Sequence, residues 1–354
     1  MKSLFNDSEL QSQFDRLGFV KVQLFDAADV DALLSHYHAQ RFNSSKSEAF
    51  FVSLDNAHPE NARRVTKGIE QVLAPKMERF ISDYQTFAGT FIVKEPGKKN
   101  IVPPHQDLTF VDETQHYSAS IWTPLVDVSE GNGALGVIPG SHTIFNYPRA
   151  FPSPQYKAGL TDHVFTLFPY IEVIEMKAGE SLIFNNRLIH ASTPNNSNNA
   201  RIAVGIGIAQ KEVQLRHYYL SPVGGNKESI EVYEVDADFY NVYSNLDLRN
   251  LYLEGKSPDN LNKIETIKNH KDYDINKEDL VDKLSNLPNA KIDNSLMERI
   301  GISPSHDVIN AERKEKDALE GTNNRDTRTF RQKFSPGNIL REVVWRMKGK
   351  PNAN

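Results

Sequence analysis

A short apolar run between two turn sequences lies near the middle of the chain, where residues 130–141 read EGNGALGVIPGS. The Asn-Gly and Pro-Gly pairs are typical of tight turns, and they bracket a predicted strand at residues 134–138. Similar runs between residues 87 and 220 predict further strands, namely 87–93, 117–126, 171–176, 181–184, 188–191, 202–208 and 213–220. About eight short strands at this spacing favour a β-sandwich or jelly roll over a parallel α/β sheet.

Helical patterns precede this β-rich region. Residues 18–25 predict a strand, and Asp26 then caps an apolar-periodic helix that runs through Leu34. A second helix is predicted at about residues 69–84, where Pro75 either kinks the helix or moves its start.

The composition changes after about residue 221, where Asn, Lys, Asp and Glu become frequent. Helices are predicted there at residues 277–287 and 338–347, and residues 288–336 either wrap over the core or are partly disordered. We therefore predict a jelly-roll domain at residues 1–220, followed by a polar, helical extension at residues 221–354.

Charge and hydropathy limit the classes of function. The 354 residues include 41 basic and 46 acidic side chains, and the net charge of −5 argues against binding to nucleic acid or to a membrane surface. The first residues lack the basic start and apolar run of a signal peptide, and no stretch approaches about 18 apolar residues. We expect a cytoplasmic protein that binds a small-molecule substrate, with its oligomeric state open.

The absence of cysteine excludes disulfides, thiolate nucleophiles and Cys-based metal sites, so a metal must bind to His, Asp or Glu. His105 and Asp107 point to the same side of an extended segment, and His190 lies in another apolar run. Two histidines and one carboxylate leave about three positions open on an octahedral ion, as in non-haem Fe(II) oxygenases.

Each of these residues also has a structural interpretation. A His-x-Asp pair is often only a surface hydrogen-bonding pair, and a histidine in an apolar strand is often a buried core residue. His58-Pro59-Glu60 has the same spacing as His105-Gln106-Asp107 but lies in a polar stretch, and we interpret it as a surface turn.

Several spaced motifs together resemble the phytanoyl-CoA dioxygenase family of Fe(II)/2-oxoglutarate-dependent oxygenases. The resemblance covers about residues 14–220. Its motifs are Leu17-Gly18-Phe19-Val20, Pro104-His105-Gln106-Asp107-Leu108, the segments 121–125, 132–142 and 178–184, and His190-Ala191-Ser192. It implies a double-stranded β-helix of the cupin-like jelly-roll type.

The resemblance also implies roles for single residues. It makes His105, Asp107 and His190 the iron ligands, with no further catalytic residue. For 2-oxoglutarate it implies that Arg201 binds the distal carboxylate, that Ser192 assists, and that Gln106 and Trp122 line the pocket. Arg201 has a separate argument, because a guanidinium inside a β-rich core needs an anion, and its planar fork fits a carboxylate. If Arg201 does not anchor the cosubstrate, Lys94 is the next candidate.

The implied activity is hydroxylation of an unactivated C–H bond with O2, releasing succinate and CO2. Related halogenating enzymes replace the metal carboxylate by a small residue, so Asp107 argues against halogenation. Two alternatives stay open: an inactive jelly-roll binding protein and a His/Asp metal-dependent hydrolase.

The sequence leaves the substrate open among amino acids, acyl compounds and secondary metabolites. Phe110, Tyr147 and Tyr156 lie in loops that we expect to wall the pocket. The extension has two alternative roles, a lid over this pocket or a subunit interface. We favour a lid for residues 221–253, because a lid excludes water from an oxidising site, and we expect the helix at 338–347 to be the contact element.

Overall fold

Two antiparallel sheets form the centre of the molecule. The computed structural model describes residues 1–40, 42, 49–55, 57–97, 100–152, 160–222, 229–268, 270, 275–288 and 290–303. The larger sheet has the strand order β1-β8-β5-β10-β3-β2, and the smaller has the order β4-β9-β6-β7. The strands are β1 Phe19–Gln23, β2 Phe50–Val52, β3 Tyr84–Lys94, β4 Val102–His105, β5 Ser118–Pro124, β6 Leu135–Val137, β7 Glu172–Val173, β8 Glu180–Asn185, β9 His190–Ser192 and β10 Arg201–Gln210. The predicted double-stranded β-helix is confirmed.

Apolar side chains from both sheets fill the space between them. Trp122 of the larger sheet and Val137 of the smaller sheet belong to one buried cluster, together with Ala203 of β10. Successive residues of a strand face opposite sides, and β10 is buried along its whole length. Val204 therefore packs on the opposite side, toward the helices. Arg201 shares the face of Ala203, which places its charged side chain between the sheets.

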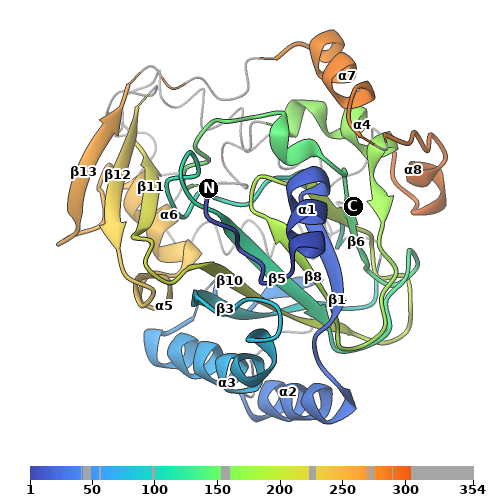
Figure 1. Ribbon diagram of the computed structural model, residues 1–354, viewed down its shortest axis with the longest axis horizontal. Coiled ribbons are helices and arrows are strands. Elements are labelled where there is room, and N and C mark those ends of the chain that lie inside the picture. Colours follow the sequence, from blue (N-terminus) through green and yellow to red (C-terminus); the bar gives the residue numbers. More distant parts are fainter. Residues whose placement is uncertain are drawn as a thin grey trace, which may run out of the picture.

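Helices cover the outer face of the larger sheet. α2 (Ala27–Ala39) and α3 (Pro59–Met77) lie against this face, below the sheet in Figure 1. Leu33 of α2 and Ile69 of α3 share a buried cluster with Phe91 of β3. No helix in the ranges given above is long and apolar enough to cross a membrane.

Two predictions about the N-terminal helices are wrong. The second helix spans Pro59–Met77 instead of 69–84, because Pro59 fits the first helical turn, where no N–H donor is needed. His58-Pro59-Glu60 is therefore the start of α3 rather than a surface turn. The helix tolerates Pro75 near its C-terminal end, and residue 84 already begins β3. A further helix, α1 (Ser8–Leu17), was not predicted.

The chain continues past residue 220 without leaving the β structure. β11 (Leu215–Leu220) pairs with β12 (Ile230–Val235), which pairs with β13 (Asn262–Ile267). The short helices α5 (Phe239–Val242) and α6 (Asn245–Leu253) pack into the same buried cluster as these strands. The described part of the extension thus contains the strands β12 and β13 in addition to its helices.

The last helices that the structure describes, α7 (Lys277–Ser285) and α8 (Leu296–Arg299), pack next to the smaller sheet. α7 coincides with the predicted helix at 277–287, and it lies with α8 close to α4 (Val164–Leu167) in Figure 1. Leu280 and Leu296 are buried in one cluster with Ile189, the residue before the expected ligand His190. The predicted helix at 338–347 lies outside the described residues, as does most of the segment 288–336.

A buried histidine of β11, just before this extension, makes stability depend on pH. His217 of β11 is 3% exposed and lies among the rings of Phe151, Tyr219 and Phe239, with centroid distances of 6.2, 5.7 and 4.7 Å. Burial lowers the pKa of His217 to about 3. Because an unfolded histidine has a pKa of about 6.5, the unfolded chain binds more protons, and folding stability falls as the pH falls below that value.

We predict that His217→Phe makes the unfolding free energy less dependent on pH. Between about pH 7 and pH 4 the loss of stability should shrink by roughly 3 kcal/mol, because phenylalanine fits the aromatic surroundings and takes up no proton. Urea unfolding at a series of pH values measures the slope. The exposed His38→Gln variant is the control and should keep the parent slope; an equal slope in His217→Phe would contradict the prediction.

Candidate metal centre

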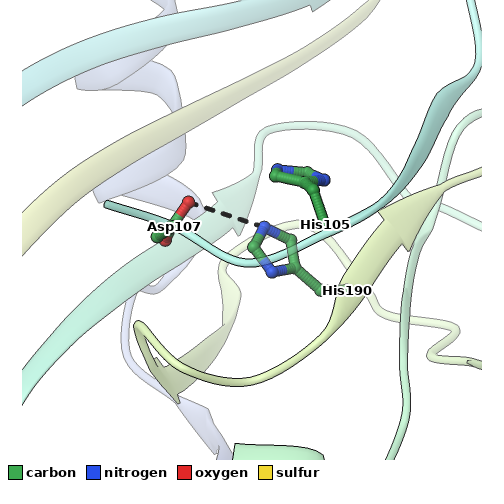
Figure 2. Close-up of side chains that lie close together, drawn as sticks. All are labelled: His105, Asp107 and His190. Carbon is green, nitrogen blue, oxygen red and sulfur yellow. Dashed lines mark ion pairs between the residues drawn. The ribbon is translucent and has the colours of Figure 1, made fainter. Parts of the chain in front are cut away.

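The three side chains that we expect to bind a metal ion meet between the two sheets. β4 ends at His105 and β9 begins at His190, and the antiparallel register sets these residues directly opposite each other. Asp107 follows β4 by two residues. One ligand atom from each of the three residues lies within 4.8 Å of the others, and Asp107 Oδ1 lies 3.7 Å from His190 Nε2. Figure 2 shows both imidazoles and the carboxylate converging.

Backbone carbonyls fix the orientation of both imidazole rings. His105 Nδ1 lies 2.9 Å from the carbonyl oxygen of Pro103, and His190 Nδ1 lies 3.0 Å from that of Leu188. A carbonyl oxygen only accepts hydrogen bonds, so each Nδ1 carries the proton and each Nε2 keeps its lone pair. This tautomer is the one in which Nε2 can bind a metal ion.

Among the described residues, neighbouring side chains donate hydrogen bonds to one oxygen of the Asp107 carboxylate. Ser120 Oγ donates a hydrogen bond of 2.7 Å to Asp107 Oδ2, and Asn186 Nδ2 donates one of 3.1 Å to the same atom. Asn186 also donates to Ser120 Oγ at 2.8 Å, so the three polar groups form one network. Oδ1 is the oxygen that faces His190.

The electrostatics suit metal binding near neutral pH. Burial, reinforced by the charge of His190, lowers the pKa of His105 to about 4, so this imidazole is neutral. Burial alone would raise the pKa of Asp107. The interactions with His190 and His105 and the hydrogen bonds from Ser120 and Asn186 outweigh burial and hold that pKa below its usual range. Neutral imidazole nitrogen and carboxylate oxygen are a donor set that fits Fe(II).

Two buried cations lie on the inner face of the larger sheet. Arg201 of β10 is directly opposite Lys94 of β3, and the two side chains are 2% and 0% exposed. Both lie against Gly133, where a Cβ atom would come within 3.2 Å of Arg201 Nε and of Lys94 Cδ. Within the described residues neither side chain forms an ion pair, and Arg201 Nε has no hydrogen-bond partner.

Contacts with neutral groups orient these cations. Lys94 Nζ donates to the carbonyl oxygens of Ser192 at 3.2 Å and Thr193 at 2.6 Å, and Arg201 Nη1 donates to that of Ile92 at 3.0 Å. Burial lowers the pKa of Arg201 to about 9, and burial and the charge of Arg201 hold the pKa of Lys94 well below its usual range. Like charges on directly opposed residues are destabilising, so the pair favours an anion in its vicinity.

The other expected cosubstrate residues are all buried, and Trp122 lies beside Arg201. Trp122 is buried, with its ring 5.3 Å from the Arg201 guanidinium carbon. Ser192 is buried two residues after His190 on β9, where side chains at this spacing share a face. Gln106 is also buried, and its amide donates to the carbonyl oxygen of Arg187.

The expected substrate residues are less closely grouped. Phe110 packs against Phe87 and Tyr240, with ring centroids 4.9 and 5.4 Å apart. Tyr147 is 46% exposed and contacts the ring of His270 at 6.3 Å. Tyr156 lies outside the described residues.

Sequence reasoning missed the two partners of the metal carboxylate, Ser120 and Asn186. Ser120 lies on β5 and Asn186 in the turn between β8 and β9, at distances of 13 and 79 residues from Asp107. Ser and Asn are common, and no local motif marks either position. Only the pairing of β5 with β8 brings the two together.

Comparison with known proteins places this site in a family. A family model described as "Phytanoyl-CoA dioxygenase (PhyH)" matches residues 14–203, which is more than half of the 354-residue chain. The chain belongs to the phytanoyl-CoA dioxygenase family. The expected membership of the phytanoyl-CoA dioxygenase family is thereby confirmed.

Curated relatives match part of the chain. "Phytanoyl-CoA dioxygenase" of Arabidopsis thaliana is 33% identical over 132 residues, which cover 34% of this chain and 43% of that protein. "Phytanoyl-CoA dioxygenase, peroxisomal" of Homo sapiens is 25% identical over 176 residues, which cover 46% of this chain and 50% of that protein. The chain thus spans about half the length of the curated relatives that it matches.

Solved structures show a partial likeness. The non-heme alpha ketoglutarate dependent carbocyclase SnoK from nogalamycin biosynthesis is 19% identical, covers 59% of this chain and 86% of its own, and has a TM-score of 0.42. HygX from Streptomyces hygroscopicus, with nickel, 2-oxoglutarate and hygromycin B bound, is 15% identical, covers 58% of this chain and 88% of its own, and has a TM-score of 0.42.

We predict that Ser120→Ala weakens Fe(II) binding by roughly ten-fold, because outer partners of a ligand carboxylate typically change metal affinity by about 10- to 100-fold. Anaerobic competition with a chromogenic chelator measures the change. Ser181→Ala is the matched control, since Ser181 is a buried serine that bonds Thr123 and not Asp107. Parent affinity in Ser120→Ala would contradict the prediction.

Proposed function

We propose that this protein is an Fe(II)- and 2-oxoglutarate-dependent oxygenase that hydroxylates an unactivated C–H bond of a small-molecule substrate, with release of succinate and CO2. The observation that carries the proposal is the convergence of His105, Asp107 and His190 on one point between the sheets. Arg201 and Lys94 add buried positive charge on the inner face of the larger sheet.

The three ligands would hold the iron through two imidazole nitrogens and one carboxylate oxygen. This leaves about three positions for small molecules. Iron supplies the activation of O2 that a protein side chain cannot perform. The part of the protein is to orient the ligands, to keep water out of the space between the sheets, and to aim one substrate C–H bond at the centre.

The two buried cations would hold the distal carboxylate of 2-oxoglutarate. Arg201 offers a planar fork, and its Nε has no partner in the described chain. Ser192 would assist, while Trp122 and Gln106 would line the pocket. An anion between Arg201 and Lys94 would offset the repulsion of these two charges.

The presence of a carboxylate, Asp107, among the proposed ligands favours hydroxylation over halogenation. Asp107 occupies the position that a halide would need, and two hydrogen bonds keep it in place. We assign this chemistry to residues 1–220 and a covering role to residues 221–253. The ring contact of Tyr240 with Phe110 supports this cover, since Phe110 lies three residues beyond Asp107.

The test is formation of succinate from 2-oxoglutarate by the full chain with Fe(II) under O2. We expect slow formation without substrate and faster formation when a metabolite library contains one. Binding of 2-oxoglutarate without any succinate would indicate an inactive binding protein. Hydrolysis that needs neither 2-oxoglutarate nor O2 would indicate a metal-dependent hydrolase.

We predict that His190→Ala abolishes succinate formation, because it removes one of three protein ligands. Asp107→Gly should differ: it should retain weaker iron binding through the two histidines and lose hydroxylation. Metal content and succinate are measured on the same samples. Full activity of the His190→Ala variant would overturn the metal assignment.

We predict that Arg201→Lys raises the 2-oxoglutarate concentration needed for half-maximal succinate formation by roughly ten-fold, or about 1.4 kcal/mol. Lysine keeps the charge and loses the fork. Arg63→Lys, at an exposed arginine that pairs with Asp238, is the control and should leave the requirement unchanged. An unchanged requirement in Arg201→Lys would move the anchor to Lys94.

A further inference from the structure

A buried ion pair lies behind the metal carboxylate. Arg149 Nη1 and Nη2 donate to the two carboxylate oxygens of Glu113 at 2.7 and 2.6 Å, so the contact is bidentate. The two side chains are only 4% and 12% exposed. Charge-assisted bidentate pairs of this kind are short and strongly oriented. Burying both charges costs free energy, which marks the pair as more than a surface contact.

The guanidinium of Arg149 also donates a hydrogen bond to the main chain of Asp107. Its Nε donates to the Asp107 carbonyl oxygen at 2.6 Å, and Nη2 lies 3.4 Å from that of Leu108. Two further hydrogen bonds link the same segments. Thr109 N donates to Arg149 O at 3.0 Å, and Arg149 N donates to Thr109 Oγ1 at 2.9 Å. One side chain thus contacts both the metal-ligand segment and Glu113.

The position of Asp107 explains why a hydrogen bond to its backbone matters. His105 is the last residue of β4, and His190 is the first of β9, so the strand ladder fixes both histidines. Asp107 lies beyond the end of β4, in a segment without strand pairing up to β5 at residue 118. Its backbone must be held by other contacts, and Arg149 provides them.

We propose that Arg149, oriented by Glu113, is a positioning residue that fixes the backbone of the metal carboxylate and so sets the geometry of the metal centre. The inference rests on the proposed function only in taking His105, Asp107 and His190 as metal ligands. Arg149 also donates to the carbonyl oxygen of Tyr147 at 3.3 Å. It therefore joins the loop that carries Tyr147, expected at the substrate pocket, to the metal-ligand segment.

The test is Co(II) binding by the full chain, measured by anaerobic calorimetry and by the visible absorption of the bound ion. Arg149→Lys keeps the charge but cannot bond Glu113 and the Asp107 carbonyl oxygen together. We expect its Co(II) affinity to fall by roughly ten-fold or more, in the range typical of outer-shell partners, and the absorption spectrum to change. A purely structural role would lower the denaturation midpoint of the metal-free protein and leave affinity and spectrum unchanged.

Arg63→Lys is the matched control. Arg63 also forms a bidentate contact, in which its Nε and Nη2 donate to Asp238 at 2.7 and 2.6 Å, but on the surface and with side chains about half exposed. This variant should bind Co(II) as the parent does. Glu113→Gln is the second test variant, for use if Arg149→Lys does not fold, and it should also weaken binding because it removes the charge that orients Arg149.

The outcomes separate this inference from the proposed function. If the parent binds Co(II) and a folded Arg149→Lys or Glu113→Gln protein binds it within two-fold of the parent, the positioning role is overturned. If the parent itself does not bind Co(II), the metal site and the inference fall together. Loss of affinity in both variants, with a parent-like Arg63→Lys protein, supports the positioning role.

Discussion

The antiparallel pairing of β4 with β9 is the constraint on which the rest of the site depends. It sets His105 opposite His190, although the two residues are far apart in the sequence. Both strands are short and lie in the smaller sheet, which packs its apolar side chains against the larger sheet. Because that packing removes water from the space between the sheets, the His105 imidazole stays neutral and able to bind a metal ion.

Two buried arginines next to the site show how the surroundings of a charge indicate its role. Arg149 forms an ion pair with Glu113 and also donates hydrogen bonds to backbone carbonyl oxygens. Arg201 lies beside a second cation, Lys94, and forms no ion pair within the ranges that the structure covers. A balanced buried charge serves the geometry of the protein itself, whereas an unbalanced one is suited to a ligand of opposite sign.

The sequence predicted the parts of this molecule that local patterns encode. Turn pairs around short apolar runs indicated the jelly roll, and the spacing of His105 and Asp107 marked two of the three clustered side chains. The partners of Asp107 depend on strand pairing between distant segments, which no local pattern reveals. The start of α3 was missed for a different reason: Pro59 was taken as a turn residue, although proline also suits the first turn of a helix.

The two hydrogen bonds on Asp107 Oδ2 have a consequence for the denticity of this ligand. A carboxylate that chelated the metal through both oxygens would occupy two positions of an octahedral ion instead of one. Two histidines, such a chelate and a bidentate cosubstrate would then saturate the ion and leave no vacancy for dioxygen. Ser120 and Asn186 donate hydrogen bonds to Oδ2, so Asp107 would bind a metal ion through Oδ1 alone. With a metal bound, the coordination number available for reaction would thus be set by a serine and an asparagine that bond only its ligand.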